Sequence, residues 1–319
     1  MQYKIVIIIV LMSSLLSSSS SLSSLSSQLL QHARIALCQL MVHGNDKVLN
    51  IKRASEAITN AAVNGNKPDI IILPEVWNSP YSTSSFPIYA EPIPKVGNSN
   101  ILDANTNPST IMLCQQAKLH KLWLVGGSIP EIDDGKLFNT ALVINPDGEI
   151  IGKHRKVHLF DIDVPGKVTF KESDSLTAGN DITVVDTPWG GMGIGICYDI
   201  RFPEYAMLMR QRGARMLIYP GAFNMVTGPA HWELLQRARA VDNQCYVAAC
   251  SPARNESSSY IAWGHSSVVS PWGDVISKAG HGDEIIYADL DFNNVETMRQ
   301  NIPCWKQKRK DIYELQTTI

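Results

Sequence analysis

Short apolar runs and amphipathic segments alternate along most of the chain. Residues 34–40 and 69–73 are apolar runs typical of strands covered on both faces, whereas residues 46–64 repeat their apolar positions with the period of a helix. The same patterns predict helices at 110–120, 203–212 and 230–242, and strands at 122–129, 138–145, 149–157, 182–187, 192–196, 215–219, 245–250 and 284–290. The strand at 122–129 is expected to end in Gly126-Gly127.

Turn sequences join several of these strands into hairpins. They lie at 146–148 (PDG), 188–190 (PWG) and 270–273 (SPWG). Helix–strand units mixed with hairpins indicate an α/β fold with two mixed sheets facing each other and helices outside, although periodicity alone does not fix that arrangement. Neither an internal repeat nor a linker divides residues 33–319, so we expect a single domain there.

The first 32 residues differ from the rest of the chain. An apolar run, IVIIIVLM, follows Lys4 and is too short to span a bilayer, and residues 13–27 are almost all Ser and Leu. We interpret residues 1–32 as a targeting leader or a disordered tail, with an organelle (mitochondrion or plastid) as the expected destination. Cytoplasmic location and secretory entry stay open, the latter because of the sequon Asn255-Glu256-Ser257. Removing the segment is expected to leave folding and activity unchanged.

Charge and cysteine content narrow the class of protein. The net charge of −2 gives no general attraction to nucleic acid, and we expect no stable membrane association of the mature domain. None of the six cysteines forms a C-x-x-C pair, so zinc-binding spacing is absent. Cys245 and Cys250 fall in one expected strand and cannot pair there. Free thiols in a reducing compartment are the prediction.

Three candidate catalytic residues follow expected strands. Glu75 stands two residues after the buried strand at 69–73, Lys156 is the last residue but one of the strand at 149–157 within HRKVH, and Cys197 follows the glycine-rich run GIGI. Ligands of α/β sheets gather at the carboxyl ends of strands. A carboxylate can take the proton of a thiol, and an ammonium can stabilise the oxyanion that forms when the thiolate attacks an amide. The three residues therefore suit hydrolysis of a carboxamide.

Each of these residues also has an ordinary structural explanation. A cysteine at the end of a buried strand is usually an inert core thiol, and glutamates and lysines near strand ends are usually solvated. A serine triad lacks its G-x-S-x-G sequence, and residues 191–195 lack the Lys-Ser/Thr of a phosphate loop. A non-catalytic scaffold or thiol sensor that uses Cys197 is the remaining alternative to an enzyme.

Longer segments around these residues carry a family resemblance. The chain resembles the nitrilase superfamily of carbon–nitrogen hydrolases, and within it the omega-amidase branch, in the segments LPEVWNSPY (73–81), KHRKVHLFDIDVPGKVTFKES (153–173), GIGICYDIRFPE (193–204), YPGAFNMVTGPAHWELLQRARAVDN (219–243) and SPARNESSSYIAWGHSSVV (251–269). The resemblance runs from about Arg34 to Leu315. It implies an α-β-β-α sandwich, usually in a homodimer, without metal or organic cofactor.

The resemblance also implies residue roles. Glu75 would be the base, Lys156 the oxyanion stabiliser and Cys197 the nucleophile. Glu172 would be a second glutamate that helps to position Lys156 and the substrate, and the N–H of Tyr198 would be a second oxyanion donor. The implied substrates are ω-monoamides such as 2-oxoglutaramate and 2-oxosuccinamate. Their remote carboxylate would meet Arg201, the hydroxyl of Tyr81 or the Thr227 region, although Arg201 could instead pair with Glu204. An N-carbamoyl compound or another linear amide is the alternative substrate.

Overall fold

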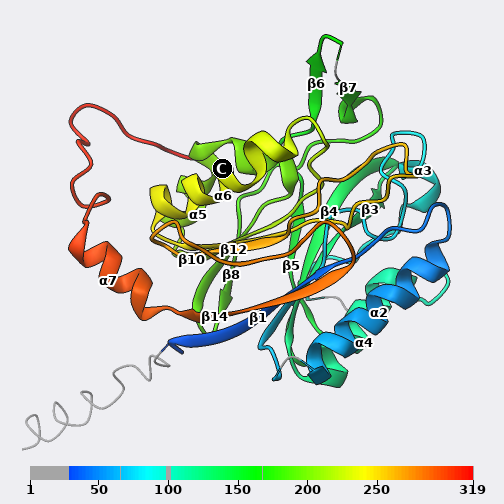
Figure 1. Cartoon of the computed structure of the whole chain (residues 1–319), viewed down its shortest axis with the longest axis horizontal. Coiled ribbons are helices and arrows are strands. Elements are labelled where there is room, and N and C mark those ends of the chain that lie inside the picture. Colours follow the sequence, from blue (N-terminus) through cyan, green and yellow to red (C-terminus); the bar gives the residue numbers. More distant parts are fainter. Residues whose placement is uncertain (1–28, 65, 98–101, 167, 319) are drawn as a thin grey trace, which may run out of the picture.

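Two six-stranded sheets form the centre of the computed structural model (Figure 1), which describes residues 29–64, 66–97, 102–166 and 168–318. The first sheet has the order β14-β1-β2-β3-β4-β5, with β1–β2–β3 parallel and the other pairs antiparallel. Its strands are β1 (His32–Gln39), β2 (Ile70–Ile72), β3 (Trp123–Asp133), β4 (Lys136–Ile144), β5 (Ile150–Arg155) and β14 (Glu284–Asp291).

The second sheet has the order β13-β12-β11-β10-β9-β8, and its central strands β9, β10 and β11 are parallel. Its strands are β8 (Thr183–Thr187), β9 (Gly190–Ile194), β10 (Ala214–Pro220), β11 (Tyr246–Cys250), β12 (Ser267–Val269) and β13 (Val275–Lys278). The three expected hairpins are confirmed, because β4–β5, β8–β9 and β12–β13 are each antiparallel neighbours.

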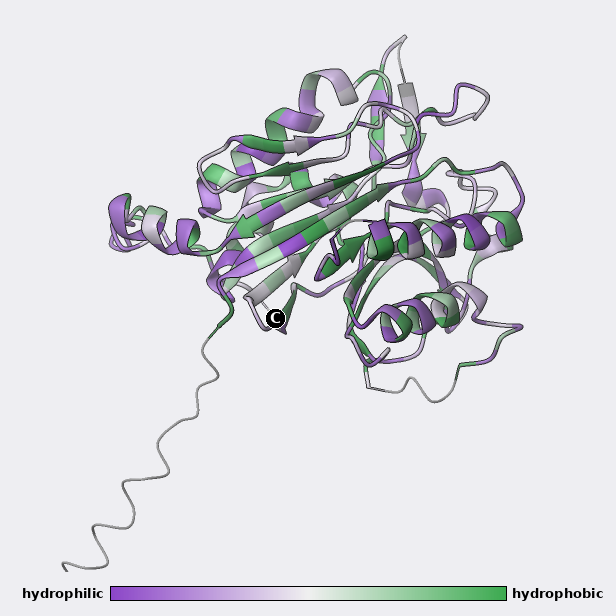
Figure 2. Ribbon diagram, turned by 60° about the horizontal axis from the view of Figure 1, so that its bottom comes forward, coloured by the Kyte–Doolittle hydropathy of each residue, from purple (hydrophilic) through white to green (hydrophobic). Residues whose placement is uncertain are grey.

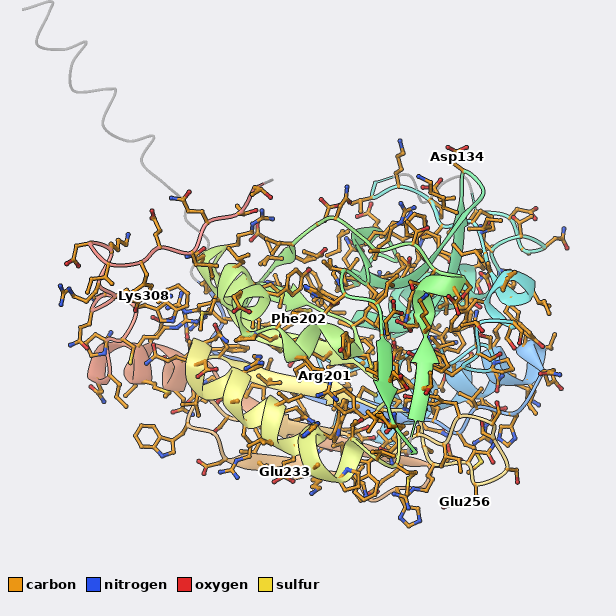
Figure 3. All side chains as sticks on the ribbon, turned by 90° about the horizontal axis from the view of Figure 1, so that it is seen from above. Asp134, Arg201, Phe202, Glu233, Glu256 and Lys308 are labelled. Atoms are coloured by element: carbon orange, nitrogen blue, oxygen red, sulfur yellow. The ribbon has the colours of Figure 1, made fainter. Side chains whose placement is uncertain are left out.

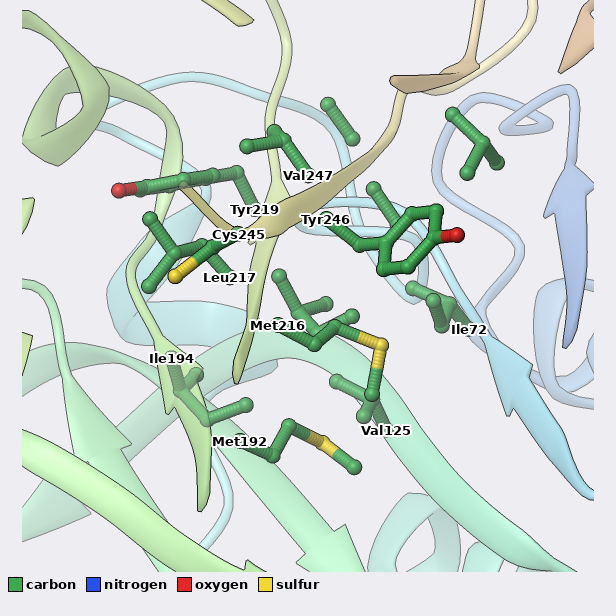
Figure 4. Packing of buried hydrophobic residues seen from close by; sticks show 14 of the residues in the cluster. Ile72, Val125, Met192, Ile194, Met216, Leu217, Tyr219, Cys245, Tyr246 and Val247 are labelled. Atoms are coloured by element: carbon green, nitrogen blue, oxygen red, sulfur yellow. The ribbon is translucent and has the colours of Figure 1, made fainter. Parts of the chain in front are cut away.

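Apolar side chains fill the space between the two sheets. Ile72 and Val125 of the first sheet belong to one buried cluster with Met192, Met216 and Tyr246 of the second (Figure 4). Strands buried on both faces have apolar residues in succession, which explains the unbroken runs in the sequence. The two sheets are therefore held face to face by an apolar core.

Helices cover the outer face of each sheet. The helices α2 (Lys47–Asn64) and α4 (Pro108–His120) pack on the first sheet through buried residues such as Ala54, Ile58 and Leu113. The helices α5 (Pro203–Gln211) and α6 (Gly228–Asn243) cover the second sheet. Both hydrophilic and hydrophobic residues colour these helices in Figure 2, as expected when one face meets a sheet and the other meets water. The predicted α-β-β-α sandwich is confirmed.

One strand boundary was predicted wrongly. β3 does not end at Gly126-Gly127 but runs on to Asp133, with an irregular register between Val125 and Ser128. Gly127 has a φ of +63°, and a Cβ there would lie 2.1 Å from the carbonyl oxygen of Pro74. The two glycines therefore mark a bulge that passes close to the backbone next to Glu75, rather than the end of a strand.

Several short or polar elements were not predicted. They are α3 (Phe86–Tyr89), the hairpin of β6 (Asp161–Val164) with β7 (Val168–Lys171), and α7 (Asn293–Asn301). Of the nine residues of α7 only Val295 and Met298 are buried, so its sequence carries little apolar periodicity.

The last residues of the expected leader, 29–32, make contacts with the rest of the chain. The predicted leader falls mostly outside the described residues, but the backbone N–H of Leu30 donates to Pro188 (2.8 Å) and the carbonyl of Gln31 accepts from Phe292 (2.7 Å). β1 itself begins at His32. Residues 29–32 therefore contact the domain. No helix within the described part of the chain is long and apolar enough to cross a membrane. The six cysteines are free thiols, as predicted.

Candidate active site

Glu75 lies just beyond β2 with no exposed surface. Its Oε1 accepts hydrogen bonds from Asn139 Nδ2 (2.8 Å) and Lys156 Nζ (3.0 Å), and its Oε2 accepts one from the backbone N–H of Ala222 (2.7 Å). These donors come from β4, the end of β5 and the loop after β10, so both sheets contribute to holding this carboxylate. A buried carboxylate with three donors has a fixed orientation.

Lys156 directly follows β5 and is also fully buried. Its Nζ lies between two carboxylates, 3.0 Å from Glu75 Oε1 and 2.9 Å from Glu172 Oε1. Glu172 begins a short 3₁₀ helix after β7, and its Oε2 accepts from the backbone N–H of Phe160 (2.7 Å). One buried ammonium therefore bridges two buried acids, which offsets the cost of removing all three charges from water.

Cys197 is placed by a sharp turn that follows β9. It is the first residue of a 3₁₀ helix, Cys197–Arg201, and its φ of +46° is unusual for a residue with a side chain. The residue is only 3% exposed, and its thiol is near enough to the Glu75 carboxylate for that group to raise the pKa of Cys197. Gly221 leaves space beside it, because a Cβ at that position would lie 3.1 Å from the Cα of Cys197.

Burial and charge together set the ionisation of this cluster. Burial raises the pKa of Glu75; the charge of Lys156 lowers it and that of Glu172 raises it, so the pKa stays above its usual range. Burial would lower the pKa of Lys156, but the two carboxylates outweigh this and raise it. Burial, reinforced by Glu75, raises the pKa of Cys197 well above its usual value. The resting cysteine is therefore a thiol that needs a base to remove its proton.

The structure brings Tyr81 into the cluster as well. Its hydroxyl donates to Glu172 Oε1 over 2.6 Å and lies 3.4 Å from Glu75 Oε1. Its ring stacks on Tyr260, with centroids 4.5 Å apart. The hydroxyl is thus already engaged by an acid of the cluster.

The other three candidates lie on the side of Cys197 that faces α6. Tyr198 follows Cys197, and the guanidinium of Arg201 lies over the rings of Tyr198 (5.5 Å) and Phe223 (4.7 Å). Arg201 Nη1 is 3.2 Å from His231 Nδ1, and Figure 3 shows Arg201 near α5 and α6. Thr227 immediately precedes α6, with its hydroxyl bonded to Asn224. The ion pairs of the described residues do not include one between Arg201 and Glu204.

Three residues in or next to the cluster were not predicted from the sequence. Asn139 is 2% exposed, donates to Glu75 from its side chain and accepts the backbone N–H of Lys156 at its carbonyl (2.8 Å). Tyr260 supports Tyr81 and donates to the carbonyl of Ala222 (2.6 Å). Asp199, two residues after Cys197, is fully buried. Asn139 lies in an ordinary apolar strand pattern, and nothing in its spacing marks it. Asp199 stands within the segment GIGICYDIRFPE, close to Cys197 in the sequence.

A small cavity of about 50 Å³ lies against the cluster. It is lined in part by Glu75, Tyr81, Ala222, Asn255 and Tyr260. A much larger cavity, about 740 Å³, lies between α7 and the strands β1, β13 and β14, and none of its lining residues belongs to the cluster. We associate the smaller cavity with the cluster, because Glu75 and Tyr81 line it, whereas the larger cavity has no residue of the cluster in its lining. Within the described part of the chain, His, Cys, Asp and Glu side chains form no group of three or more that could hold a metal ion.

Known proteins resemble the chain in both sequence and structure. The carbon-nitrogen hydrolase family model matches residues 34–300. The chloroplastic omega-amidase of Arabidopsis thaliana is 54% identical over 88% of this chain and 73% of its own length, and human omega-amidase NIT2 is 52% identical over 89% and 97%. The crystal structure of Saccharomyces cerevisiae Nit3, a member of branch 10 of the nitrilase superfamily, has a TM-score of 0.80 and 47% identity over 90% of this chain and all of that one.

The fold is a helix–sheet–sheet–helix sandwich, and residues from both sheets form a buried cluster of acids, a lysine and a cysteine. Together with the family match, these features define the class of protein: it is a hydrolase of carbon–nitrogen bonds. The chain belongs to the carbon-nitrogen hydrolase family, within the nitrilase superfamily. The cysteine nucleophile expected from the sequence is consistent with this family, and identities of 52–54% support omega-amidase function.

Proposed function

We propose that this chain is an omega-amidase that hydrolyses short ω-monoamides of dicarboxylic acids, of the 2-oxoglutaramate and 2-oxosuccinamate type, to the dicarboxylate and ammonia. The observation that carries the proposal is the Glu75–Lys156–Glu172–Cys197 cluster. The names of the omega-amidase relatives support the substrate class.

The geometry supports the following first half-reaction. Glu75, whose charge acts on the thiol, takes the proton of Cys197 as the sulfur attacks the carbonyl carbon of the amide. The carbonyl oxygen becomes an oxyanion, stabilised by the Lys156 ammonium and the backbone N–H of Tyr198. Glu75, whose raised pKa lets it hold the proton, then gives it to the departing nitrogen. Ammonia leaves, and the acyl group stays on Cys197 as a thioester.

Water completes the reaction. Glu75 takes a proton from a water molecule, which attacks the thioester carbon through a second oxyanion held by the same donors. The carbon–sulfur bond breaks, the acid is released and the proton returns to Cys197. Glu172 and Tyr81 act by holding Lys156, since both lie within hydrogen-bond distance of its Nζ. The proposed role of Tyr81 is therefore positioning rather than direct recognition of the remote carboxylate.

Arg201 is the proposed partner of the substrate's remote carboxylate. Arg201 ends the 3₁₀ helix that Cys197 begins. Burial lowers the pKa of its guanidinium, and a negative charge on Cys197 would raise it. Among the described residues no Asp or Glu forms an ion pair with it. Thr227 lies at the N-terminus of α6, whose helix dipole favours a negative charge. A carboxylate bound there would point the amide at Cys197.

The test measures ammonia release from succinamate, glutaramate and butyramide by the purified protein. We expect kcat/KM for the two carboxylates to exceed that for butyramide by at least about 10²-fold, because a partly buried cation left without its anion disfavours the neutral analogue. Arg201→Met should remove most of this preference, whereas Arg212→Met, a distant arginine bound to the carbonyl of Ile182, should keep it. Equal efficiency on both substrate series would favour a general amidase.

A homodimer and an organelle location are also proposed. The plant relative named as chloroplastic supports a leader-directed location, while the other relatives carry no such word in their names. Sedimentation of the purified chain and imaging of the full-length protein fused to a C-terminal fluorophore test the two proposals. A monomer at micromolar concentration, or a protein glycosylated in the medium, would contradict them.

A further inference from the structure

The proposed catalytic residues are divided between the two sheets. Glu75 follows β2 and Lys156 follows β5, both of the first sheet, whereas Cys197 follows β9 of the second. The position of the ammonium relative to the sulfur therefore depends on how the end of β5 is fixed to the turn after β9. Displacements of about 1 Å between reacting groups can cost roughly 10²-fold in rate.

The side chain of Asp199 connects these two segments. Its Oδ1 accepts from the backbone N–H (2.9 Å) and Nδ1 (2.8 Å) of His158, and its Oδ2 accepts from the backbone N–H of Ile196 (2.8 Å) and lies 3.2 Å from Nε2 of His154. Ile196 directly precedes Cys197. His154 and His158 stand two residues before and two residues after Lys156. One buried carboxylate thus contacts the nucleophile turn and both sides of the lysine.

The surroundings of the two histidines fix their orientation. His154 is 1% exposed, and its Nδ1 is 3.0 Å from the hydroxyl of Thr183, which leaves Nε2 to donate to Asp199. The ring of His158 stacks on Phe202, with centroids 3.7 Å apart. The bond from Ile196 to Asp199 also holds the turn in which Cys197 adopts its positive φ.

We propose that Asp199 is a positioning residue that fixes the Lys156 ammonium relative to the Cys197 sulfur through His154 and His158. The proposal rests on the proposed roles of Lys156 and Cys197, but not on the identity of the amide. Asp199 touches neither the substrate nor the reacting atoms in this scheme. Its contribution is the alignment of two segments that belong to different sheets.

The decisive variants are His158→Ala and His158→Asn. Alanine removes the Nδ1 donor, whereas the Nδ2 of asparagine lies at the same branch position as histidine Nδ1 and can donate to Asp199 in its place. We expect kcat to fall about 10- to 100-fold in His158→Ala, with KM changed by less than about threefold, and most of kcat to return in His158→Asn. Asp199→Asn should lower kcat at least as much, provided that it folds.

A second measurement does not need an amide substrate. Alkylation of Cys197 by iodoacetamide, followed by mass spectrometry of its peptide, reports the thiol itself and separates it from the exposed Cys304. Because the charge of Lys156 lowers the pKa of Cys197, a displaced lysine should slow alkylation in His158→Ala, and His158→Asn should restore it. If the wild-type protein hydrolysed no amide, the proposed function would fail while this comparison still decided the positioning role.

Glu91→Gln is the matched control for loss of a buried ionised contact. Glu91 is 1% exposed and forms an ion pair with Lys47 (2.8 Å), and neither residue belongs to the cluster. The Glu91→Gln variant should have a lower melting temperature but the wild-type kcat and alkylation rate. The proposal is overturned if His158→Ala keeps wild-type kcat and alkylation, or if both variants of His158 lose activity equally and only in proportion to their lost stability.

Discussion

Replacing Glu172 with glutamine tests the charge balance of the site. Glu172 accepts hydrogen bonds from Tyr81 (2.6 Å), Lys156 (2.9 Å) and the backbone N–H of Phe160 (2.7 Å). Glutamine has the same shape but one oxygen fewer, so at least one of these donors will face an NH₂ group. The variant also leaves Lys156 with Glu75 as its remaining acidic partner within the cluster.

The structure gives the size and direction of the effect. Removing one member of a buried ion pair typically costs 3–5 kcal/mol, and we expect about 3 kcal/mol here because Glu75 still balances Lys156. The charge of Glu172 also raises the pKa of Glu75, so its loss should lower that pKa and weaken the base. We therefore expect kcat to fall by roughly 10²-fold, the lower end of the effect of a lost general base. The acidic limb of the kcat/KM profile should move to lower pH.

Urea denaturation and ammonia release between pH 4 and 9 measure both effects. Glu91→Gln serves again as the control, because it removes a buried charge outside the cluster and should affect stability alone. The reasoning would be refuted if the acidic limb of the kcat/KM profile of Glu172→Gln shifted to higher pH. A wild-type kcat together with an acidic limb at the wild-type pH would refute it as well.

Four further predictions follow from other features. Cys197→Ala should abolish turnover and the thioester adduct seen by mass spectrometry without loss of the fold; activity within tenfold of wild type would contradict this. Asn139→Leu should lower kcat about 10- to 100-fold, because Glu75 loses a donor at 2.8 Å, and an unchanged kcat would remove Asn139 from the site. Deleting residues 1–28 should leave melting temperature and activity unchanged, whereas deleting 1–32 should lower the melting temperature through the lost bonds of Leu30 and Gln31. Burial raises the pKa of Asp199, but hydrogen bonds from His154 and His158 outweigh this and lower it. The stabilising effect of the Asp199 carboxylate should therefore be lost as pH falls below its unfolded pKa of about 3.9 and through the lower folded value, so the difference in unfolding free energy between wild type and Asp199→Asn should shrink in acid.

The sequence predicted correctly those elements that a single local pattern determines. The apolar runs at 34–40 and 69–73 became β1 and β2, and the helical period at 46–64 became α2. Glu75, Lys156 and Cys197 each come within three residues of the end of a strand, as predicted.

Long-range contacts account for what the sequence did not reveal. Asn139 reaches Glu75 across 64 positions of the chain, and Ala222 reaches it across 147. No periodicity encodes such pairs, since they depend on how the two sheets are docked. Gly126-Gly127 was misinterpreted for a related reason: two glycines indicate a break in a strand, and only the nearby carbonyl of Pro74 explains why the strand continues through them.

The division of the site between two sheets also makes activity a probe of folding. Neither sheet with its own helices contains the whole cluster. A partly folded chain in which only one sheet has formed therefore cannot place the Lys156 ammonium, held between Glu75 and Glu172, opposite the Cys197 thiol. During refolding, helical signal should return before ammonia release, and the delay should report the time at which the inner faces dock. Under denaturant the order reverses: hydrolysis should be the first property lost.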